Sequence, residues 1–111
     1  MEHEVTEADW KVFRKVRGPA LERFCERILD EVEAIRVDAS RSYHERYRAV
    51  FNLLRKRDDQ LARAFDDPRR SQMVIQLANM YALDLLAPEE LERFTPETRA
   101  RIEFITKELA R

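Results

Sequence analysis

The sequence predicts an all-α protein, and three observations support this fold class. The chain has 111 residues and a single glycine, whereas β-sheet proteins need glycine in their tight turns. No segment alternates apolar and polar residues as a half-buried strand does. Arg, Glu, Leu and Ala are abundant, and all four are good helix formers. We therefore expect one domain, residues 1–111, built as a small antiparallel bundle of four to five helices joined by short loops.

The first helix is predicted to be long and kinked. Thr6 followed by Asp9 is typical of a helix start. Gly18-Pro19 interrupts the helix, because proline removes a backbone donor and clashes with the carbonyl four residues earlier. One alternative is that Gly18 ends one helix and Pro19 begins another. The apolar residues keep their helical spacing across the dipeptide, which favours one helix kinked at Gly18-Pro19. These residues are Trp10, Phe13, Val16, Ala20, Phe24, Ile28, Val32 and Ile35.

A second helix is predicted over residues 43–65. Ser42 and Glu45 have the spacing of a capping box, in which each side chain bonds the other residue's backbone amide. The apolar stripe of this helix comprises Tyr43, Tyr47, Val50, Leu54, Leu61 and Phe65. The stripe is interrupted by RKRDDQ, where it would need Arg57 or Asp58. Either the helix extends into solvent there, or one of these charges is buried against a partner charge.

Three further helices are predicted after residue 66. Asp67 is expected to cap a helix that begins at Pro68 and runs to about Leu86. Residues 87–90, APEE, predict the start of a short helix that ends near Phe94. Residues 95–97, TPE, predict the start of the last helix. Acidic residues in both of these first turns are favourable against the helix dipole.

The stretch SQMVIQLANMYAL, residues 71–83, has no charge, although charged residues make up 39% of the chain. Burying an unpaired charge is costly, whereas an amide needs only hydrogen-bond partners. This helix is therefore expected to be enclosed on nearly all sides. It is either central in its own chain or shared between the core and a second copy. We favour the second alternative, because few helices are available to surround a central one. The predicted twofold interface comprises Gln72, Gln76, Asn79, Met80 and Leu83.

Composition and the chain start predict a cytoplasmic location. The single cysteine, Cys25, cannot form an intramolecular disulfide, which fits a reducing compartment. The first residues, MEHEVTEADW, contain no apolar signal segment. No apolar run approaches the roughly 20 residues of a membrane span.

No residue pattern indicates catalysis, a cofactor or a metal. His3 lies near the terminus, and His44 has no other ligand type at metal-binding spacing. Cys25 flanks the apolar stripe and is expected to be a buried structural thiol. The pairs Asp58-Asp59 and Asp66-Asp67 are adjacent residues that do not share a helix face. We expect no enzymatic activity and no cofactor, and an enzyme or small-ligand binder using a pocket in the bundle is the third alternative.

Arg69 and Arg70 are unusual, because positive charge in a first helical turn opposes the helix dipole. Three explanations are open. The arginines pair with Asp66 or Asp67, they reach Asp58 or Asp59 across the hairpin, or they hold an anion or an acidic partner.

The overall charge predicts protein association rather than nucleic-acid binding. The net charge is −1, but residues 41–70 carry 9 basic and 5 acidic groups. A nucleic-acid-associated or regulatory accessory protein that uses this basic segment is therefore the alternative function. The leading interpretation is a non-enzymatic association module that forms a homodimer, with no membrane partner.

One resemblance adds to this interpretation. Residues 42–71, SYHERYRAVFNLLRKRDDQLARAFDDPRRS, and residues 20–29, ALERFCERIL, resemble a group of short bacterial all-α proteins of uncharacterised function. The resemblance covers most of the chain. It implies the fold class but no activity, and it carries no catalytic motif and no functional residues.

Overall fold

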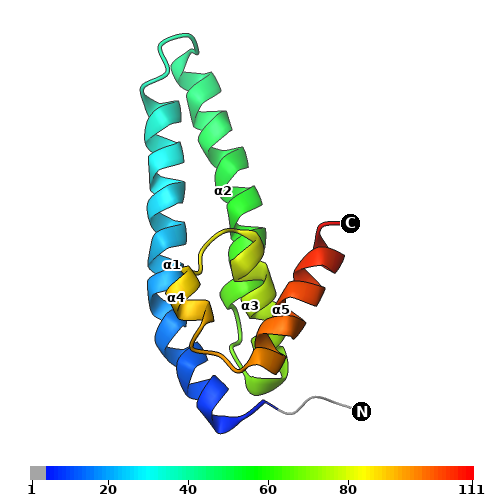
Figure 1. The fold of residues 1–111 in the computed structure, drawn as a ribbon. Coiled ribbons are helices and arrows are strands. Elements are labelled where there is room, and N and C mark those ends of the chain that lie inside the picture. Colours follow the sequence, from blue (N-terminus) through cyan, green and yellow to red (C-terminus); the bar gives the residue numbers. More distant parts are fainter. Residues whose placement is uncertain (1–4) are drawn as a thin grey trace.

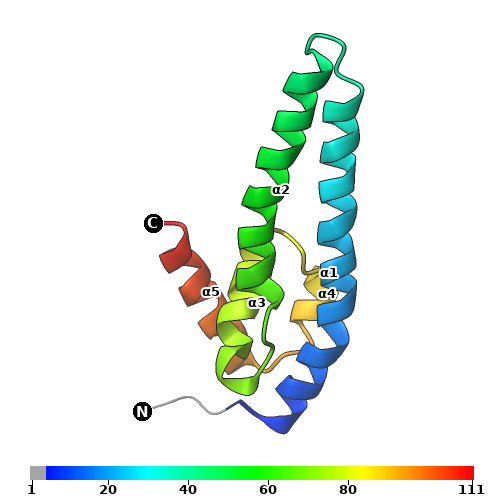
Figure 2. The same ribbon diagram turned by 180° about the vertical axis from the view of Figure 1, so that it is seen from behind.

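A computed structural model describes residues 5–111 and confirms the all-α fold (Figure 1). The described residues form five α-helices and one 3₁₀ turn, without a strand. The elements are α1 (Glu7–Arg36), α2 (Tyr43–Phe65), η1 (Arg70–Gln72), α3 (Met73–Ala82), α4 (Pro88–Leu91) and α5 (Pro96–Leu109). α1 and α2 form a long antiparallel hairpin, and α3, α4 and α5 lie beside the half of it that is remote from the turn (Figures 1 and 2).

α1 is one continuous helix that contains Pro19, as the sequence predicted. Gly18 and Pro19 are both exposed, so the carbonyl that Pro19 leaves without its donor can be solvated. The dark-blue N-terminal part of α1 is inclined to the cyan part in both ribbon views (Figures 1 and 2). The predicted apolar stripe faces the core, and its middle residues are buried. They are Phe13, Val16, Ala20, Phe24 and Ile28.

α2 begins and ends at the predicted residues. Ser42 Oγ accepts a hydrogen bond from the Glu45 amide at 3.1 Å, and the Glu45 carboxylate accepts one from the Ser42 amide at 2.8 Å. At the interruption of the stripe, Arg57 makes a two-point contact with Glu31 of α1, at 3.1 and 2.8 Å. The structure thus confirms a paired charge at Arg57, while Asp58 is exposed.

α3 is shorter than predicted, and the expected cap is wrong. Asp67 does not cap a helix, because it has φ 51° and its carboxylate binds Arg69 instead. The chain forms the η1 turn before α3 begins at Met73. α3 ends at Ala82 because Asp84 takes the left-handed conformation with φ 57°. The Leu85 amide then bonds the Met80 carbonyl at 2.9 Å, and the Asp84 amide bonds Tyr81 at 3.0 Å, which forms a Schellman motif.

The core is built around α3, which contacts α1, α2 and α5. Met73, Leu77 and Met80 of α3 are completely inaccessible to solvent. The helices of its own chain therefore enclose most of the uncharged segment. α4 begins at Pro88, as predicted, but ends at Leu91 rather than near Phe94. α5 begins at Pro96, as predicted, and Thr95 caps it by accepting from the Thr98 amide at 3.4 Å.

Candidate functional site

The half of the hairpin near its turn projects beyond the rest of the molecule. The last buried residue of α1 is Ile28, and the first of α2 is Ala64. We call residues 29–58 the arm, which ends before Leu61, the residue of α2 that is partly buried against the core. The molecule measures 54 × 25 × 22 Å, and its radius of gyration is 16.5 Å, against about 13 Å for a compact domain of this length. The elongated shape arises because α3, α4 and α5 leave the arm uncovered (Figures 1 and 2).

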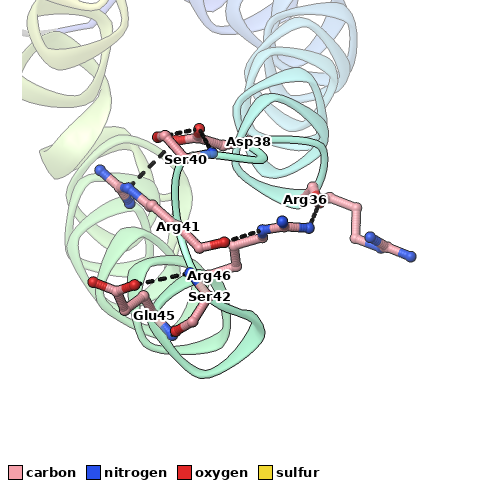
Figure 3. Close-up of polar contacts among 7 residues, drawn as sticks. All are labelled: Arg36, Asp38, Ser40, Arg41, Ser42, Glu45 and Arg46. Carbon is pink, nitrogen blue, oxygen red and sulfur yellow. Dashed lines mark hydrogen bonds and ion pairs between the residues drawn. The ribbon is translucent and has the colours of Figure 1, made fainter.

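Polar contacts fasten the tip of the arm (Figure 3). Asp38 accepts hydrogen bonds from the amide and the hydroxyl of Ser40, at 3.1 and 2.6 Å. Arg46 donates to the carbonyls of Arg41 and Arg36, at 3.0 and 3.1 Å, and so ties the start of α2 to the end of α1. The tip is therefore ordered without help from the other helices, and the arm presents its side chains on a preorganised support.

Large apolar side chains are exposed along the arm. On α2 they are Tyr43 (77% exposed), Tyr47 (68%), Phe51 (52%) and Leu54 (40%), and on α1 Leu29 (66%). We call these five residues the arm face. The α2 residues follow one another at helical spacing, so they share one side of that helix. Guanidinium groups flank two of the rings, with Arg46 at 4.8 Å from the centre of Tyr43 and Arg55 at 5.8 Å from that of Phe51.

An open groove of about 680 Å³ runs beside this face, between the two helices of the arm. Its lining mixes apolar and charged side chains, namely Val32, Glu33, Arg36, Tyr43, Arg46, Tyr47 and Val50. The apolar stripe predicted for α2 is therefore buried at one end of the helix and exposed at the other. Phe65 is buried against the other helices and Leu61 is partly buried, whereas Tyr43, Tyr47 and Leu54 face solvent.

The five residues predicted for a homodimer interface differ in how far they are buried within the subunit. Gln76 is 3% exposed and Met80 is inaccessible, so both are enclosed within the subunit. Gln76 donates to the Asp66 carbonyl at the end of α2. Asn79 is half-buried and donates to the Ile75 carbonyl at 2.9 Å, Leu83 is half-buried, and Gln72 is exposed. We expected a second copy to shield Gln76 and Met80 from solvent, but the helices of the same chain already do so.

Arg69 and Arg70 have different partners. Arg69 binds Asp67, which is the first of the three predicted explanations. Arg70 fits none of them, because it pairs with Glu7 of α1 at 2.9 Å and lies 5.3 Å from the centre of the Trp10 ring. Both interactions are intramolecular.

The basic charges of residues 41–70 do not form one surface. Arg46 and Arg57 are bound within the hairpin. Of the exposed basic residues of α2, Arg55, Lys56 and Arg63 lie within about one turn of Asp58 or Asp59, whereas Arg48 lies two turns nearer the tip than Arg55.

Chemically reactive residues do not cluster in the described part of the chain. Cys25 is half-buried rather than buried as predicted, and His44 is exposed. Within residues 5–111 no group of His, Cys, Asp and Glu side chains has the arrangement of a metal site. His3 lies outside the described residues. None of the helices in this part combines the length and apolar character that crossing a membrane requires.

Sequence reasoning missed the role of Asp9, which joins the start of α1 to the start of α5. Its carboxylate accepts hydrogen bonds from the Thr95 amide (2.9 Å), the Thr95 hydroxyl (2.8 Å) and the Thr98 hydroxyl (2.7 Å). Burial raises the pKa of Asp9, but the hydrogen bonds from Thr98 and Thr95 together outweigh it, so the pKa lies below its usual value. The spacing from Thr6 indicated a helix start but gave no signal of this distant partner.

A second missed cluster holds the end of α3 against α1. Arg23 makes a two-point contact with Glu90, at 2.6 and 3.2 Å, and donates to the Leu85 carbonyl at 2.8 Å. Arg27, one turn further along α1, donates to the Leu83 carbonyl at 2.6 Å and to that of Asp84. Positive groups are favourable at a helix C-terminus. These residues position α3 and α4 and are engaged within the subunit.

No family model, curated protein or solved structure matches this chain.

Proposed function

We propose that this protein is a non-enzymatic association module that pairs with a second copy of itself through the arm face. The exposure of Tyr43, Tyr47 and Phe51 on a projecting, internally fastened hairpin is the observation that carries the proposal. Scattered exposed apolar residues are normal, but contiguous patches of this size usually mark an interaction site.

The area of the arm face agrees with such a role. A buried aromatic side chain covers about 150–250 Å², so the exposed fractions of the five residues correspond to roughly 500–600 Å² of apolar surface. A stable interface buries about 800 Å² per partner, of which the rim is polar. Together with the charged residues around it, the arm face is large enough for one subunit's share.

A second copy is the partner that fits the arm best. Two-helix hairpins cannot enclose their own apolar side, and two of them complete a four-helix bundle. The arm also carries both signs of charge, mainly acidic on α1 and mainly basic on α2, so the two helices are complementary in net charge. A strongly basic or acidic partner is not required.

The test is the solution mass of two matched variants, measured by size-exclusion chromatography with light scattering. Tyr47→Ser/Phe51→Ser removes the centre of the arm face and is expected to elute as a folded monomer of about 13.3 kDa, because neither ring belongs to the core. Phe104→Ser is the control, since Phe104 of α5 is 65% exposed but lies outside the arm. It should keep the dimeric mass of the unaltered chain. Equal masses for the unaltered chain and the arm variant would refute the proposal.

The nucleic-acid alternative has less support from the geometry. Its basic residues are partly engaged in intramolecular contacts, as Arg46 and Arg57 show. A salt-dependent mobility shift with short DNA or RNA duplexes would favour it over self-association.

A further inference from the structure

We infer that the two copies pack with their arms parallel and their tips at the same end, so that α1 of each copy lies against α2 of the other. This inference rests on the proposed self-association and specifies its geometry. It follows from the apolar spacing, the charges and the register of the hairpin.

The apolar residues of both helices lie on one side of the hairpin. On α1, Leu21, Cys25, Leu29 and Val32 follow one another at intervals of four, four and three residues. On α2, Tyr43, Tyr47, Phe51 and Leu54 have the same intervals. Val32, Tyr43 and Tyr47 line the same groove, which places the two rows side by side. A second hairpin covering this side would contact both helices.

Two twofold arrangements bring such faces together. If the axis runs along the arms, α1 lies against α2 of the second copy and the tips coincide. If the axis crosses the arms, α1 lies against α1, α2 lies against α2, and the tips point in opposite directions. Apolar contact alone does not distinguish these arrangements.

The charges beside the apolar rows distinguish them. On α1 the exposed flank is acidic, with Glu22, Glu26, Asp30 and Glu33 at helical spacing. On α2 the flank beside Phe51 carries Arg48 and Arg55 two turns apart, with Asp59 one turn beyond Arg55 on the side remote from the tip. An axis across the arms would place acidic against acidic and basic against basic. A twofold axis along the arms places opposite charges together, which stabilises the parallel dimer and disfavours the antiparallel one.

The register of the hairpin then pairs particular residues. Within one subunit Arg46 bonds the Arg36 carbonyl and Arg57 bonds Glu31, and these two contacts of long side chains fix the register of the hairpin to within about one helical turn. Rotation about an axis along the arms preserves height. Glu33 of one copy therefore lies within about two helical turns of Arg48 of the other, and Glu26 within about two turns of Arg55. Each dimer contains this set of contacts twice.

Charge reversal tests the pairing. Glu26→Lys/Glu33→Lys and Arg48→Glu/Arg55→Glu should each raise the dimer Kd at least tenfold, because four attractive contacts become repulsive. The chain that carries all four substitutions should regain most of the affinity. Lys56→Glu/Arg63→Glu is the matched control for the α2 variant, since it makes the same charge change on the side of α2 opposite Tyr47. It should leave the Kd within about threefold of the original.

A cross-link at the tip supplies an independent readout. Ala39 is exposed in the turn of the arm, and Ala39→Cys in a Cys25→Ser background should be joined to its copy by a short bis-maleimide. Helix axes in a bundle are about 8–10 Å apart, so parallel tips are within reach. A dimer whose charge variants bind normally and whose tips do not cross-link would overturn the parallel geometry and leave self-association intact. A chain that is monomeric in every form would overturn both.

Discussion

The substitution Asp9→Asn is predicted to destabilise the fold by separating α1 from α5. The Asp9 carboxylate accepts three hydrogen bonds from Thr95 and Thr98. An asparagine of the same shape has one acceptor oxygen and places an amide donor against at least one of these donors. The threonine hydroxyls can rotate to accept from that amide, so the loss is smaller than three full hydrogen bonds. We expect a cost of about 2 kcal/mol.

Thermal unfolding at fixed protein concentration measures this cost. For a chain of this size, 2 kcal/mol corresponds to a fall in Tm of about 8 °C. Thr98→Val keeps the shape of the threonine and removes one of the three donors, so it should cost about half as much. Combining the two substitutions should cost less than the sum, because both break the same contact. A change below about 0.5 kcal/mol for Asp9→Asn would refute the assigned role.

The effect of Asp9→Asn should also depend on pH. Because the fold holds the pKa of Asp9 below its value of about 3.9 in the unfolded chain, the unfolded chain binds the proton first as the pH falls. The stabilisation by the carboxylate is complete above this range and is lost as the pH falls through the lowered pKa. The difference in stability between the original and the variant should therefore be constant near neutral pH and shrink in acid. A constant difference down to pH 2–3 would contradict the reasoning.

Three further substitutions test local features of the fold by chemical denaturation. Gly18→Ala should stabilise by about 0.5–1 kcal/mol, because a Cβ at this helical position would meet nothing within 4 Å; a loss of stability would indicate strain at the kink. Asp84→Gly should stabilise by a similar amount, since it relieves a non-glycine residue with φ 57° and removes a negative charge from a helix C-terminus; a destabilised variant would show that the carboxylate has an unrecognised partner. Glu90→Gln should cost about 1 kcal/mol by weakening the contact with the partly exposed Arg23, and an unchanged midpoint would mean that the pair contributes nothing to stability.

Local signals in the sequence predicted the helices well, where the residues that decide a boundary are neighbours. The Ser42 and Glu45 capping box needs no distant contact, and α2 begins where it predicts. The start of α3 is different. Asp67-Pro68 has the local pattern of a helix start, but Asp67 binds Arg69 and Arg70 is held by Glu7 and Trp10 of α1. The Asp67–Arg69 pair is local, but the contacts of Arg70 come from a distant helix, and no local rule contains that information.

The sequence could not show what covers an apolar helix face. Burial within a subunit and burial between subunits select similar residue types, so the uncharged segment was compatible with a core helix and with an interface, and our prediction favoured the interface. The structure encloses Gln76 and Met80 within the chain. Conversely, the periodicity of Tyr43, Tyr47 and Leu54 predicted an inward face, whereas no element of the described chain reaches it. The arm face becomes visible once the lengths and positions of α3, α4 and α5 are known.

The molar mass of the unaltered chain by sedimentation equilibrium tests the central claim most directly. Across concentrations from about 1 to 100 µM, self-association through the arm predicts a mass that approaches twice the 13.3 kDa of one chain. A single species of 13.3 kDa at the highest concentration would contradict it, since the aromatic side chains of the arm would then remain in water without a second copy to cover them.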